Sequence, residues 1–304
     1  MKILVTGGAG FIASNIVDLF IKEGHEVAII DNLTTGKKEN LNPKAKFYNA
    51  DIRDKNLIKI LEEFKPDIID HHAAQIDVRK SCTDPLYTEE VNVIGTINLL
   101  EAAVKTKIKK VIFASTGGAI YGEIKDENGA DENHKQDPIS PYAITKRSVE
   151  MFLYFYKVTY GLNYTVLRYG NVFGPRQDPL GEAGVIAIFI GKIAKGENST
   201  IYGDGEQLRD YVYVEDVAQA NLLALNKGEG EIFNVGSGVG TSVNTLFKHL
   251  KEITQFMGTA VYAPPRAGEL TRSVLNAEKI HKELGWQPKV DIEEGLRLTL
   301  KSNA

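Results

Sequence analysis

We predict an α/β fold, a doubly wound parallel sheet with helices on both faces, from two features of the 304-residue chain. Short apolar segments alternate with segments of helical periodicity through the first half, as in parallel sheets with right-handed crossovers. A glycine-rich turn, Gly7-Gly8-Ala9-Gly10, joins the first apolar segment to the first helical one. The apolar content of 43% and the charged content of 25% are typical of a globular protein with a sizeable core.

The first half of the chain predicts six strands and four helices. Apolar runs bounded by turn residues predict strands at 3–5, 27–30, 47–49, 67–70, 111–114 and 165–168. Apolar residues at helical spacing predict helices at 15–23, 55–64, 90–106 and 148–158. The last of these continues a helix that carries Tyr142 and Lys146.

The alternation loosens after residue 168. Residues 171–184 are rich in Gly, Pro and charge and predict a loop region, and 263–268 predict a Pro/Gly/Arg loop. The segments between and beyond them predict helices at 185–195, from 214 onward and at 275–284, a strand and turn at 200–205, and a strand at 232–235 that returns to the main sheet.

Charge and cysteine content exclude several classes of protein. The net charge of −4 argues against a nucleic-acid-binding surface. Cys82 is the single cysteine and cannot form an internal disulfide, which favours a reducing cytoplasm. No stretch approaches the roughly 18 apolar residues of a membrane span, and the N-terminus lacks the pattern of a signal peptide.

The glycine turn has the features of a dinucleotide site. The motif Gly8-x-Gly10-x-x-Ala13 follows a strand and opens a helix, whose N-terminus offers amide donors and a positive dipole to a pyrophosphate. Asp31 ends the second strand, where an acidic residue hydrogen-bonds the adenosine ribose. A carboxylate there repels a 2′-phosphate, so we predict NAD rather than NADP as the cofactor.

These features divide the chain into two parts. We predict a Rossmann-type NAD-binding domain at 1–167, with a returning segment near 212–236. A smaller, mixed α/β C-terminal substrate domain, discontinuous in sequence, would occupy 168–304.

Asp51-Ile52 follows the third strand and either flanks the adenine or caps the helix that begins near residue 55.

Tyr142 and Lys146 lie four positions apart, so on a helix they share one face. A free tyrosine has a pKa near 10, and a neighbouring ammonium group favours its phenolate. Such a phenolate can exchange a proton in alcohol–ketone chemistry beside a nicotinamide. A further hydroxyl would come from Ser115 or Thr116, where the fifth strand ends.

These motifs together resemble the extended short-chain dehydrogenase/reductase family, and within it the UDP-glucose 4-epimerase group of NAD-dependent sugar-nucleotide epimerases. The resemblance covers nearly the whole chain. Besides the glycine turn and Tyr142-x-x-x-Lys146, it is carried by Asp31-Asn32-Leu33, His72-Ala73-Ala74, Asn92-Val93-x-Gly95-Thr96, Arg168-Tyr169-x-Asn171-Val172-x-Gly174-Pro175, Gly203-Asp204-Gly205-x-Gln207-x-Arg209-Asp210-Tyr211-Val212-Tyr213-Val214-x-Asp216 and Arg266-x-Gly268-Glu269.

The resemblance implies roles for the matching positions. Tyr142 would be the acid/base, with Lys146 as its partner and Thr116 as the third catalytic residue. The cofactor would be bound by Gly7, Gly10, Phe11, Ile12, Asp31, Asn32, Asp51, Ile52, Ala73, Ala74, Asn92, Tyr142, Lys146 and Tyr169. The nucleotide diphosphate would be held by Asn171, Arg209 and Arg266, and arginine forks match phosphate oxygens. The small Ser273, seven places after Arg266, would admit a UDP-N-acetylhexosamine.

The chain departs from the family's pattern at Gly117, where a catalytic Ser or Thr usually stands four residues before the Tyr of the Tyr-Gly pair. Thr116, or else Ser115, must then supply the hydroxyl. Gly118 and Ala119 occupy the places of the Asp-Glu acids of the related 4,6-dehydratases, and decarboxylases usually keep a Glu there.

The resemblance therefore implies inversion at C4 of a UDP-hexose through a 4-keto intermediate, in a homodimer. The alternatives are a 4,6-dehydratase, a decarboxylase and a non-catalytic NAD-binding regulator. His71-His72 has no third ligand at metal spacing, so we expect no metal site.

Overall fold

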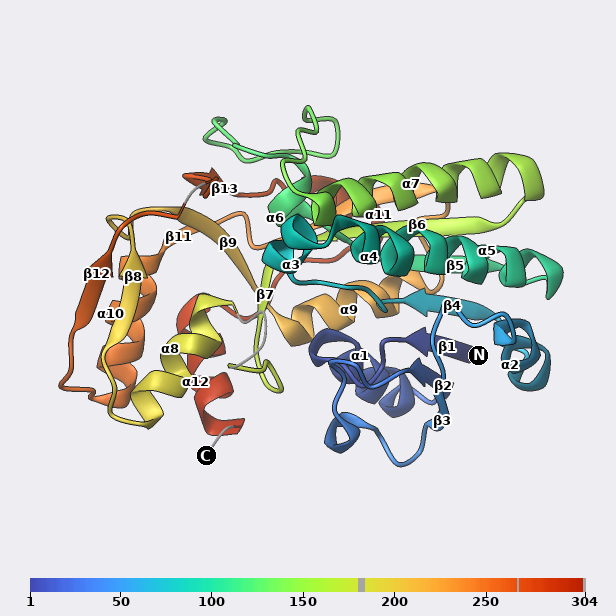
Figure 1. Cartoon of the computed structure of the whole chain (residues 1–304), viewed down its shortest axis with the longest axis horizontal. Helices are drawn as coiled ribbons and strands as arrows, with labels where there is room; N and C mark the ends of the chain where they lie inside the picture. The colour runs from blue at the N-terminus through green and yellow to red at the C-terminus, as the bar shows by residue number, and fades with distance from the viewer. Residues whose placement is uncertain (180–183, 267, 303–304) are drawn as a thin grey trace.

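The computed structural model describes residues 1–179, 184–266 and 268–302, and its largest sheet confirms the predicted fold class. Seven strands pair in the order β10-β6-β5-β4-β1-β2-β3, every neighbour parallel (Figure 1). They are β1 (Lys2–Thr6), β2 (Glu26–Asp31), β3 (Lys46–Asn49), β4 (Ile68–His71), β5 (Lys110–Thr116), β6 (Asn163–Tyr169) and β10 (Glu231–Val235). The carboxyl ends of parallel strands meet at one edge, where such sheets bind ligands.

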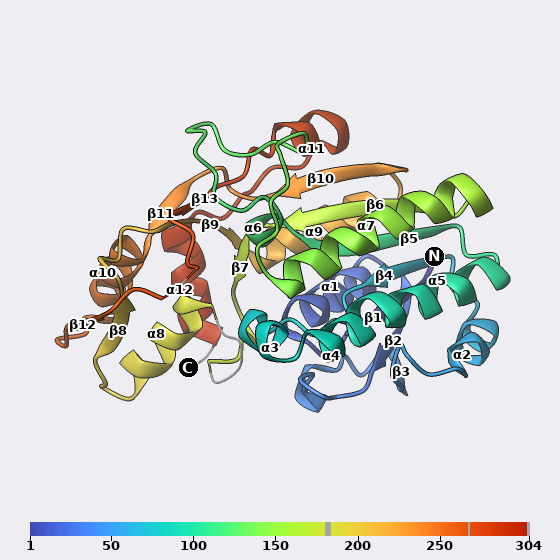
Figure 2. The same ribbon diagram turned by 45° about the horizontal axis from the view of Figure 1, so that its top comes forward.

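Helices cover both faces of this sheet (Figures 1 and 2). One face buries α1 (Phe11–Lys22), α9 (Val214–Ala224) and α11 (Glu278–Leu284), and the other buries α2 (Leu57–Phe64), α5 (Gly95–Lys105) and α7 (Pro141–Tyr160). Alternate residues of β1 serve the two cores, since Ile3 and Val5 face α1 whereas Leu4 faces α5. This continuous apolar character is expected of strands buried on both faces.

The approach to α5 differs in detail from the single helix predicted at 90–106. Two short helices, α3 (Val78–Thr83) and α4 (Pro85–Glu89), lead into a π-helical segment, η2 (Glu90–Ile94), before α5 begins at Gly95. A 3₁₀ turn, η1 (Lys38–Asn40), follows β2. The widened turn of η2 contains Asn92, and π-helical turns are frequent at functional sites.

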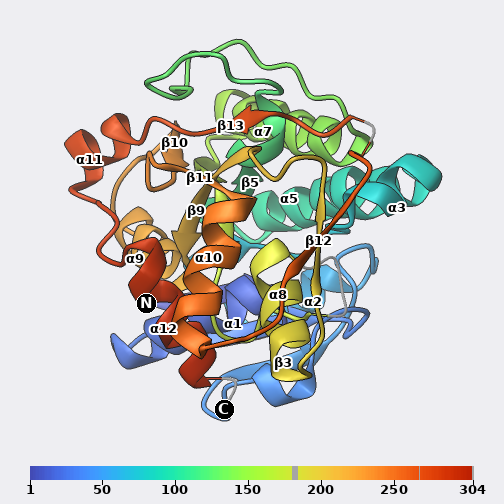
Figure 3. The same ribbon diagram turned by 90° about the vertical axis from the view of Figure 1, so that its left-hand side faces the viewer.

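Two smaller sheets follow in the second half of the chain (Figure 3). One contains β7 (Asn171–Phe173), β9 (Leu208–Tyr213), β11 (Gly240–Ser242) and β13 (Arg272–Ser273); the other pairs β8 (Ser199–Tyr202) with β12 (Ala260–Ala263). Their apolar core also buries α8 (Val185–Ala194), α10 (Val243–Thr254) and α12 (Ile292–Ser302). Because β11 runs antiparallel to β9 while β7 and β13 run parallel to it, the first of these sheets is mixed.

Several expectations for the second half need correction. The predicted loop at 171–184 contains β7, and its residues 180–183 lie outside the described part of the chain. The predicted helix at 275–284 begins only at Glu278, because Leu275 and its neighbours pair in extended form with Ala130, whose carbonyl accepts from the Asn276 amide at 2.8 Å. The strand at 232–235 does return to the main sheet, as β10 beside β6. The domain boundary at 167 stays a prediction.

No helix in the described ranges is long and apolar enough to cross a membrane.

Candidate active site

The glycine turn after β1 forms a cradle suited to a pyrophosphate. Gly7 has a φ of +72°, and a Cβ there would lie 2.8 Å from the Ala73 amide nitrogen, so the two backbones are in close approach. Gly10 is the N-cap of α1 and supplies no side chain to the first amides of Phe11 and Ile12. These residues therefore fit a dinucleotide phosphate, with the helix dipole favouring its negative charge.

Asp31 lies at the end of β2 beside this cradle. Its carboxylate accepts hydrogen bonds from the amides of Ala9 at 3.0 Å and Leu33 at 2.8 Å, and burial raises its pKa while these bonds oppose the rise. The carboxylate thus joins the glycine turn to the end of β2. Its role toward a ribose stays a prediction.

The adenine-side residues predicted from sequence form a polar cluster with one buried apolar member. Asp51 accepts from Asn32 Nδ2 at 2.7 Å and pairs with Arg53 at 2.8 Å, and the Arg53 bond is the main cause of its pKa of about 2. Ile52 is buried, and a Cβ on Gly95 would lie 2.9 Å from its side chain. Asp51 is therefore a fixed anion whose acceptor oxygens are already used by the chain.

The segment after β4 is held by Asn92 rather than left free. The Asn92 side chain accepts from the Gln75 amide at 2.7 Å and donates to the Gln75 carbonyl and the Thr145 hydroxyl, both at 3.0 Å. Asn92 thereby connects η2, α7 and the segment that contains Ala73 and Ala74. Because the side-chain amide of Asn92 is fully bonded within the protein, we infer that Asn92 holds this segment in place.

Tyr142 and Lys146 lie in the first two turns of α7. Ser140 caps this helix by accepting from the Ala143 amide at 3.2 Å, and Pro141 occupies its first position. Lys146 is buried, donates to the Ala114 carbonyl at 2.7 Å and has its ammonium 5.9 Å from the centre of the Tyr142 ring. The helix therefore presents the pair at the carboxyl end of β5.

The additional hydroxyl predicted beside Tyr142 and Lys146 belongs to Thr116. Burial raises the pKa of Tyr142 to about 12, against the effect of a hydrogen bond with the Thr116 side chain. Ser115 instead donates to the buried Glu150 carboxylate at 2.7 Å. Burial lowers the pKa of Lys146 to about 7. The structure therefore brings Tyr142, Lys146 and Thr116 together and turns Ser115 away.

Tyr169 ends β6 with its hydroxyl turned into the protein. The hydroxyl donates to Asn221 on α9 at 3.0 Å, and the ring stacks on His72 with centroids 6.2 Å apart. The hydroxyl is therefore engaged within the protein, and the contact of Tyr169 with the cofactor stays a prediction.

A pocket of about 340 Å³ contains three of the predicted substrate residues, Asn171, Arg209 and Arg266. The Arg266 guanidinium lies 3.9 Å from the centre of the Tyr202 ring, and Arg209 Nη2 lies 3.8 Å from Glu269. The sequence assigned no site role to the other lining residues, although three of them lie in the motifs quoted for the family. They are Val185, Ile188, Phe189, Lys192, Thr200, Ile201, Tyr202, Gln207, Tyr211, Val243 and Glu269. Three cations and an aromatic ring suit a nucleotide diphosphate.

Ser273 does not line this pocket. It is buried on β13 opposite Arg209 in register, and its hydroxyl donates to the Gly118 carbonyl at 3.3 Å. A Cβ on Gly118 would in turn lie 3.2 Å from the Asn171 amide oxygen. Ser273 therefore lies between the pocket and the residues that follow Thr116.

A more open hollow of about 380 Å³ lies elsewhere, around His281 and Trp286. It includes none of the predicted catalytic, cofactor or substrate residues, whereas the smaller pocket contains three substrate residues, so its larger volume does not make it the site. Within the described residues, no cluster of His, Cys, Asp or Glu side chains could hold a metal ion.

The comparisons with known proteins agree with this geometry. A model of the NAD dependent epimerase/dehydratase family matches residues 3–236. UDP-glucose 4-epimerase from Thermotoga maritima, solved with UDP-glucose, is 52% identical; the match covers 100% of this chain and 98% of that one, with a TM-score of 0.98. UDP-glucose 4-epimerase from Thermus thermophilus, solved with NAD, is 47% identical over 99% of this chain and 98% of that one, with a TM-score of 0.95.

A third solved structure has a different substrate in its name. UDP-N-acetylglucosamine 4-epimerase from Methanobrevibacter ruminantium, in complex with UDP-N-acetylmuramic acid, is 38% identical, covering 99% of this chain and 97% of that one, with a TM-score of 0.94. Family model, full-length similarity and site geometry agree, and the chain belongs to the NAD-dependent epimerase/dehydratase family.

Proposed function

We propose that the protein is a UDP-glucose 4-epimerase, which inverts C4 of a UDP-hexose with NAD as its cofactor. The proposal is carried by two groups of residues, Tyr142 with its Thr116 bond and Lys146 one turn on, and the pocket that contains Arg209 and Arg266. Asn171 supports a link between them, because it lines the pocket and its amide oxygen would lie 3.2 Å from a Cβ on Gly118, two residues after Thr116. The full-length similarity to UDP-glucose 4-epimerases supports it. We place the enzyme in the cytoplasm, in keeping with its lone cysteine.

The chain's own residues perform the proton transfer. Tyr142 as phenolate takes the proton of the sugar 4-hydroxyl, while Thr116 hydrogen-bonds the same oxygen. The hydrogen bond with Thr116 lowers the pKa of the phenol against the rise caused by burial. Lys146 in its ammonium form, with its nitrogen 5.9 Å from the ring centre, would further favour the phenolate. NAD, which the glycine turn and Asp31 would hold, would supply a reversible acceptor for the C4 hydride.

The arginine pocket accounts for inversion without release. Arg209 and Arg266 hold the diphosphate while the 4-keto sugar turns within the site. As hydride returns to the opposite face of C4, Tyr142 gives its proton back to the C4 oxygen, which forms the inverted alcohol. Because binding energy from the distant nucleotide retains the ketone, no net oxidation occurs.

The two positions that carry the acids for water loss in dehydratases hold no carboxylate in this chain. Gly118 and Ala119 lie in the short helix α6 (Gly117–Ile120), in the places of the dehydratase Asp and Glu, and bring no carboxylate. The same positions lack the Glu of decarboxylases. The chain therefore favours epimerisation over its two closest alternatives.

Incubation of the purified protein with UDP-galactose tests the proposal. We expect UDP-glucose to form, with no net accumulation of NADH, and Tyr142→Phe to abolish this conversion while leaving the melting temperature near wild type. A 4-keto-6-deoxy product would instead indicate a dehydratase. Failure to convert any of several UDP-hexoses would leave a cofactor-binding regulator.

The substrate range extends to UDP-N-acetylhexosamines in this proposal. Ser273 is a small residue opposite Arg209 in register and bonded to the Gly118 carbonyl, and the similar protein from Methanobrevibacter ruminantium is a UDP-N-acetylglucosamine 4-epimerase. A side-by-side assay of UDP-galactose and UDP-N-acetylgalactosamine tests it.

The enzyme acts as a homodimer in this proposal, paired through α7 and α5. Met151, Tyr154, Phe155 and Val158 are all at least 46% exposed and follow one face of α7 at helical spacing. Figure 1 shows α5 beside α7 on the same side of the molecule. Val158→Glu should convert a dimer to a monomer in light scattering, whereas Lys157→Glu should not.

A further inference from the structure

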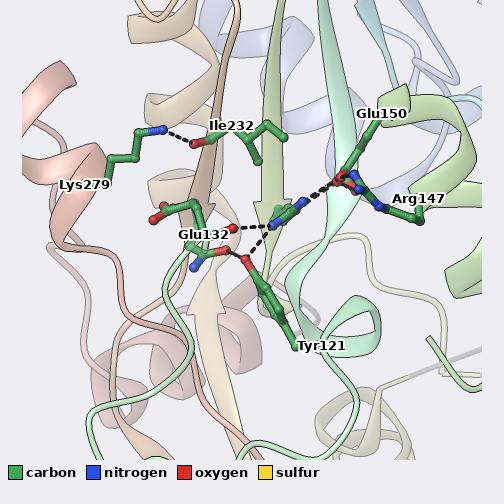
Figure 4. A network of polar contacts seen from close by, with 9 residues as sticks. Tyr121, Glu132, Arg147, Glu150, Ile232 and Lys279 are labelled. Atoms are coloured by element: carbon green, nitrogen blue, oxygen red, sulfur yellow. Dashed lines mark hydrogen bonds and ion pairs between the residues drawn. The ribbon is translucent and has the colours of Figure 1, made fainter. Parts of the chain in front are cut away.

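A buried carboxylate lies one helical turn beyond Lys146. Glu150 on α7 is 2% exposed, and both of its oxygens are engaged (Figure 4). Oε1 accepts from Ser115 Oγ at 2.7 Å and Arg168 Nε at 2.9 Å, and Oε2 accepts from Arg168 Nη2 at 2.6 Å and Arg147 Nη1 at 3.3 Å. Sequence reasoning gave Glu150 no role.

Arg168 continues this network across the sheet. Its Nη1 donates to the Tyr121 hydroxyl at 2.7 Å, and Tyr121 donates to Asn234 Oδ1 on β10 at 2.8 Å. The backbone amide of Asn234 donates to Glu132 Oε1 at 2.7 Å. The guanidinium is fully buried, so the position of Glu150 is fixed from several directions.

Two side chains of α7 therefore fasten the helix to consecutive residues of β5. Lys146 donates to the Ala114 carbonyl and Glu150 accepts from Ser115, and the next residue of the strand is Thr116. Because Tyr142 lies on the same helix, these two contacts fix the strand end with Thr116 relative to the phenol.

Glu150 also supplies the negative charge nearest to Lys146 along α7. Around Lys146 lie Tyr142 on its own helix, the Phe113 ring on β5 with its centre 4.8 Å away, and His71 on β4. Burial lowers the pKa of His71 well below its usual value, so that ring is neutral. Arg168 and Arg147 are the cations that face Glu150.

We propose that Glu150 is a positioning residue of the catalytic centre, which holds Thr116 against α7 and keeps Lys146 in its ammonium form. The ion pair with Arg168 is poorly explained by stability, because apolar residues of similar volume are often as stabilising as a buried pair. The inference rests on the proposed function, since it concerns the same centre.

Glu150→Gln tests the charge. The amide keeps the shape of the side chain, but its loss of charge should favour the neutral amine of Lys146. We expect the pKa of Lys146 to fall by about one pH unit. Carbon NMR of labelled lysine measures this pKa, and the Lys146→Arg variant assigns the Lys146 signal. With UDP-galactose, the alkaline limb of the kcat profile should move down by a similar amount, with KM changed less than kcat.

Ser115→Ala tests the positioning. It removes the bond to β5 and leaves the charge, so kcat should fall about tenfold without a shift of the pH profile. Thr165→Val is the control, because it deletes another buried hydroxyl, bonded to the Gly228 carbonyl at 2.6 Å, on β6. This variant should keep wild-type kcat and pH profile.

Arg147→Met provides a second charge variant in case Glu150→Gln does not fold. Removing this partly exposed cation should raise the pKa of Lys146, the opposite direction. An unmoved Lys146 titration in these variants, together with unchanged kcat in Ser115→Ala, would overturn the inference. The NMR titration needs no turnover, so an inactive wild type would overturn the proposed function alone.

Discussion

The side chain of Leu275 occupies the space that any side chain at Gly117 would need. Leu275 Cδ1 and Cδ2 lie 2.5 and 2.9 Å from the place of a Cβ on Gly117. The Leu275 amide is fixed by the Asp210 carboxylate at 3.1 Å, so its backbone cannot easily withdraw. The glycine is therefore matched to Leu275, and the hydroxyl that bonds Tyr142 belongs to the preceding residue, Thr116.

A double-mutant cycle tests this match. Gly117→Ala should destabilise the protein by about 1–3 kcal/mol through overpacking, and Leu275→Ala by about 2–5 kcal/mol through a cavity. The double variant should lose clearly less unfolding free energy than the two single variants lose together, because the new methyl group enters the space that Leu275 vacates. Additive unfolding free energies from urea titration would contradict the match.

Thr116→Val should lower kcat about 100-fold, since the substituted side chain has the same shape but cannot hydrogen-bond Tyr142 or substrate. KM for UDP-galactose should change little, and Thr116→Ser should recover most of the rate. The assay is conversion of UDP-galactose to UDP-glucose. Full turnover in Thr116→Val would mean that no hydroxyl is needed beside Tyr142.

Arg266→Lys should weaken UDP binding by about tenfold or more, because lysine loses the planar stack on Tyr202 and the paired donors. Isothermal titration with UDP measures this, and the NAD content should stay at the wild-type level. Arg297→Lys is the matched control, since Arg297 lies on α12 and pairs with Glu293 on the surface. Equal weakening in both variants would refute the assignment of Arg266.

The buried lysine makes stability depend on pH. Burial lowers the pKa of Lys146 to about 7, whereas the unfolded chain keeps the ordinary value near 10.5. Between these values the unfolded state binds more protons, so this group makes unfolding cost more as pH rises. The contribution of Lys146 to the slope of unfolding free energy against pH approaches about 1.4 kcal/mol per pH unit.

Lys146→Met should therefore flatten the rise in unfolding free energy between pH 7 and 9.5, measured without added NAD or UDP. Lys110→Met should also flatten it above pH 8, because burial lowers the pKa of Lys110 to about 8. Lys22→Met on the exposed side of α1 is the control and should keep the wild-type slope. An unchanged slope in Lys146→Met would contradict the buried charge.

Ser273→Tyr should remove activity on UDP-N-acetylgalactosamine and spare activity on UDP-galactose, because a large ring there would take the space of a 2-acetamido group. Ser273→Ala is the control and should keep both activities. A melting curve distinguishes a gate from misfolding, since Ser273 is buried. Parallel loss on both substrates in a folded variant would count against the gate.

The sequence predicted the large sheet well because its signals are local. Apolar runs and the glycine turn placed β1, α1 and β2 correctly, and the helix with Tyr142 and Lys146 follows from four-residue spacing. Helices α10 and α12 were not predicted, although both have one apolar face, because neither contains a recognised motif. The short strands β7, β11 and β13 have two or three residues each and are defined only by their pairing with β9.

The candidate site shows the same limit. Tyr142 and Lys146 were found from residue type and spacing, and the two arginines from the resemblance to the family. The preference for Thr116 over Ser115 gains its physical reason only from the fold, in which Ser115 bonds Glu150. A single Glu within a helix gives no sequence signal of burial. Its pairing with Arg168 is set by the tertiary fold, which spacing along the chain does not reveal.

Asp210 has a consequence for the order in which the protein folds. Its buried carboxylate accepts the amides of Ser237, Gly238 and Leu275, which lie 27, 28 and 65 residues further along the chain. Such loops must close before their contacts contribute, and sequence-distant contacts slow folding. We therefore expect the neighbourhood of Arg209 and Gly117 to be completed late, after the helix that carries Tyr142 has formed. During synthesis the enzyme would remain inactive until the chain beyond Leu275 has emerged.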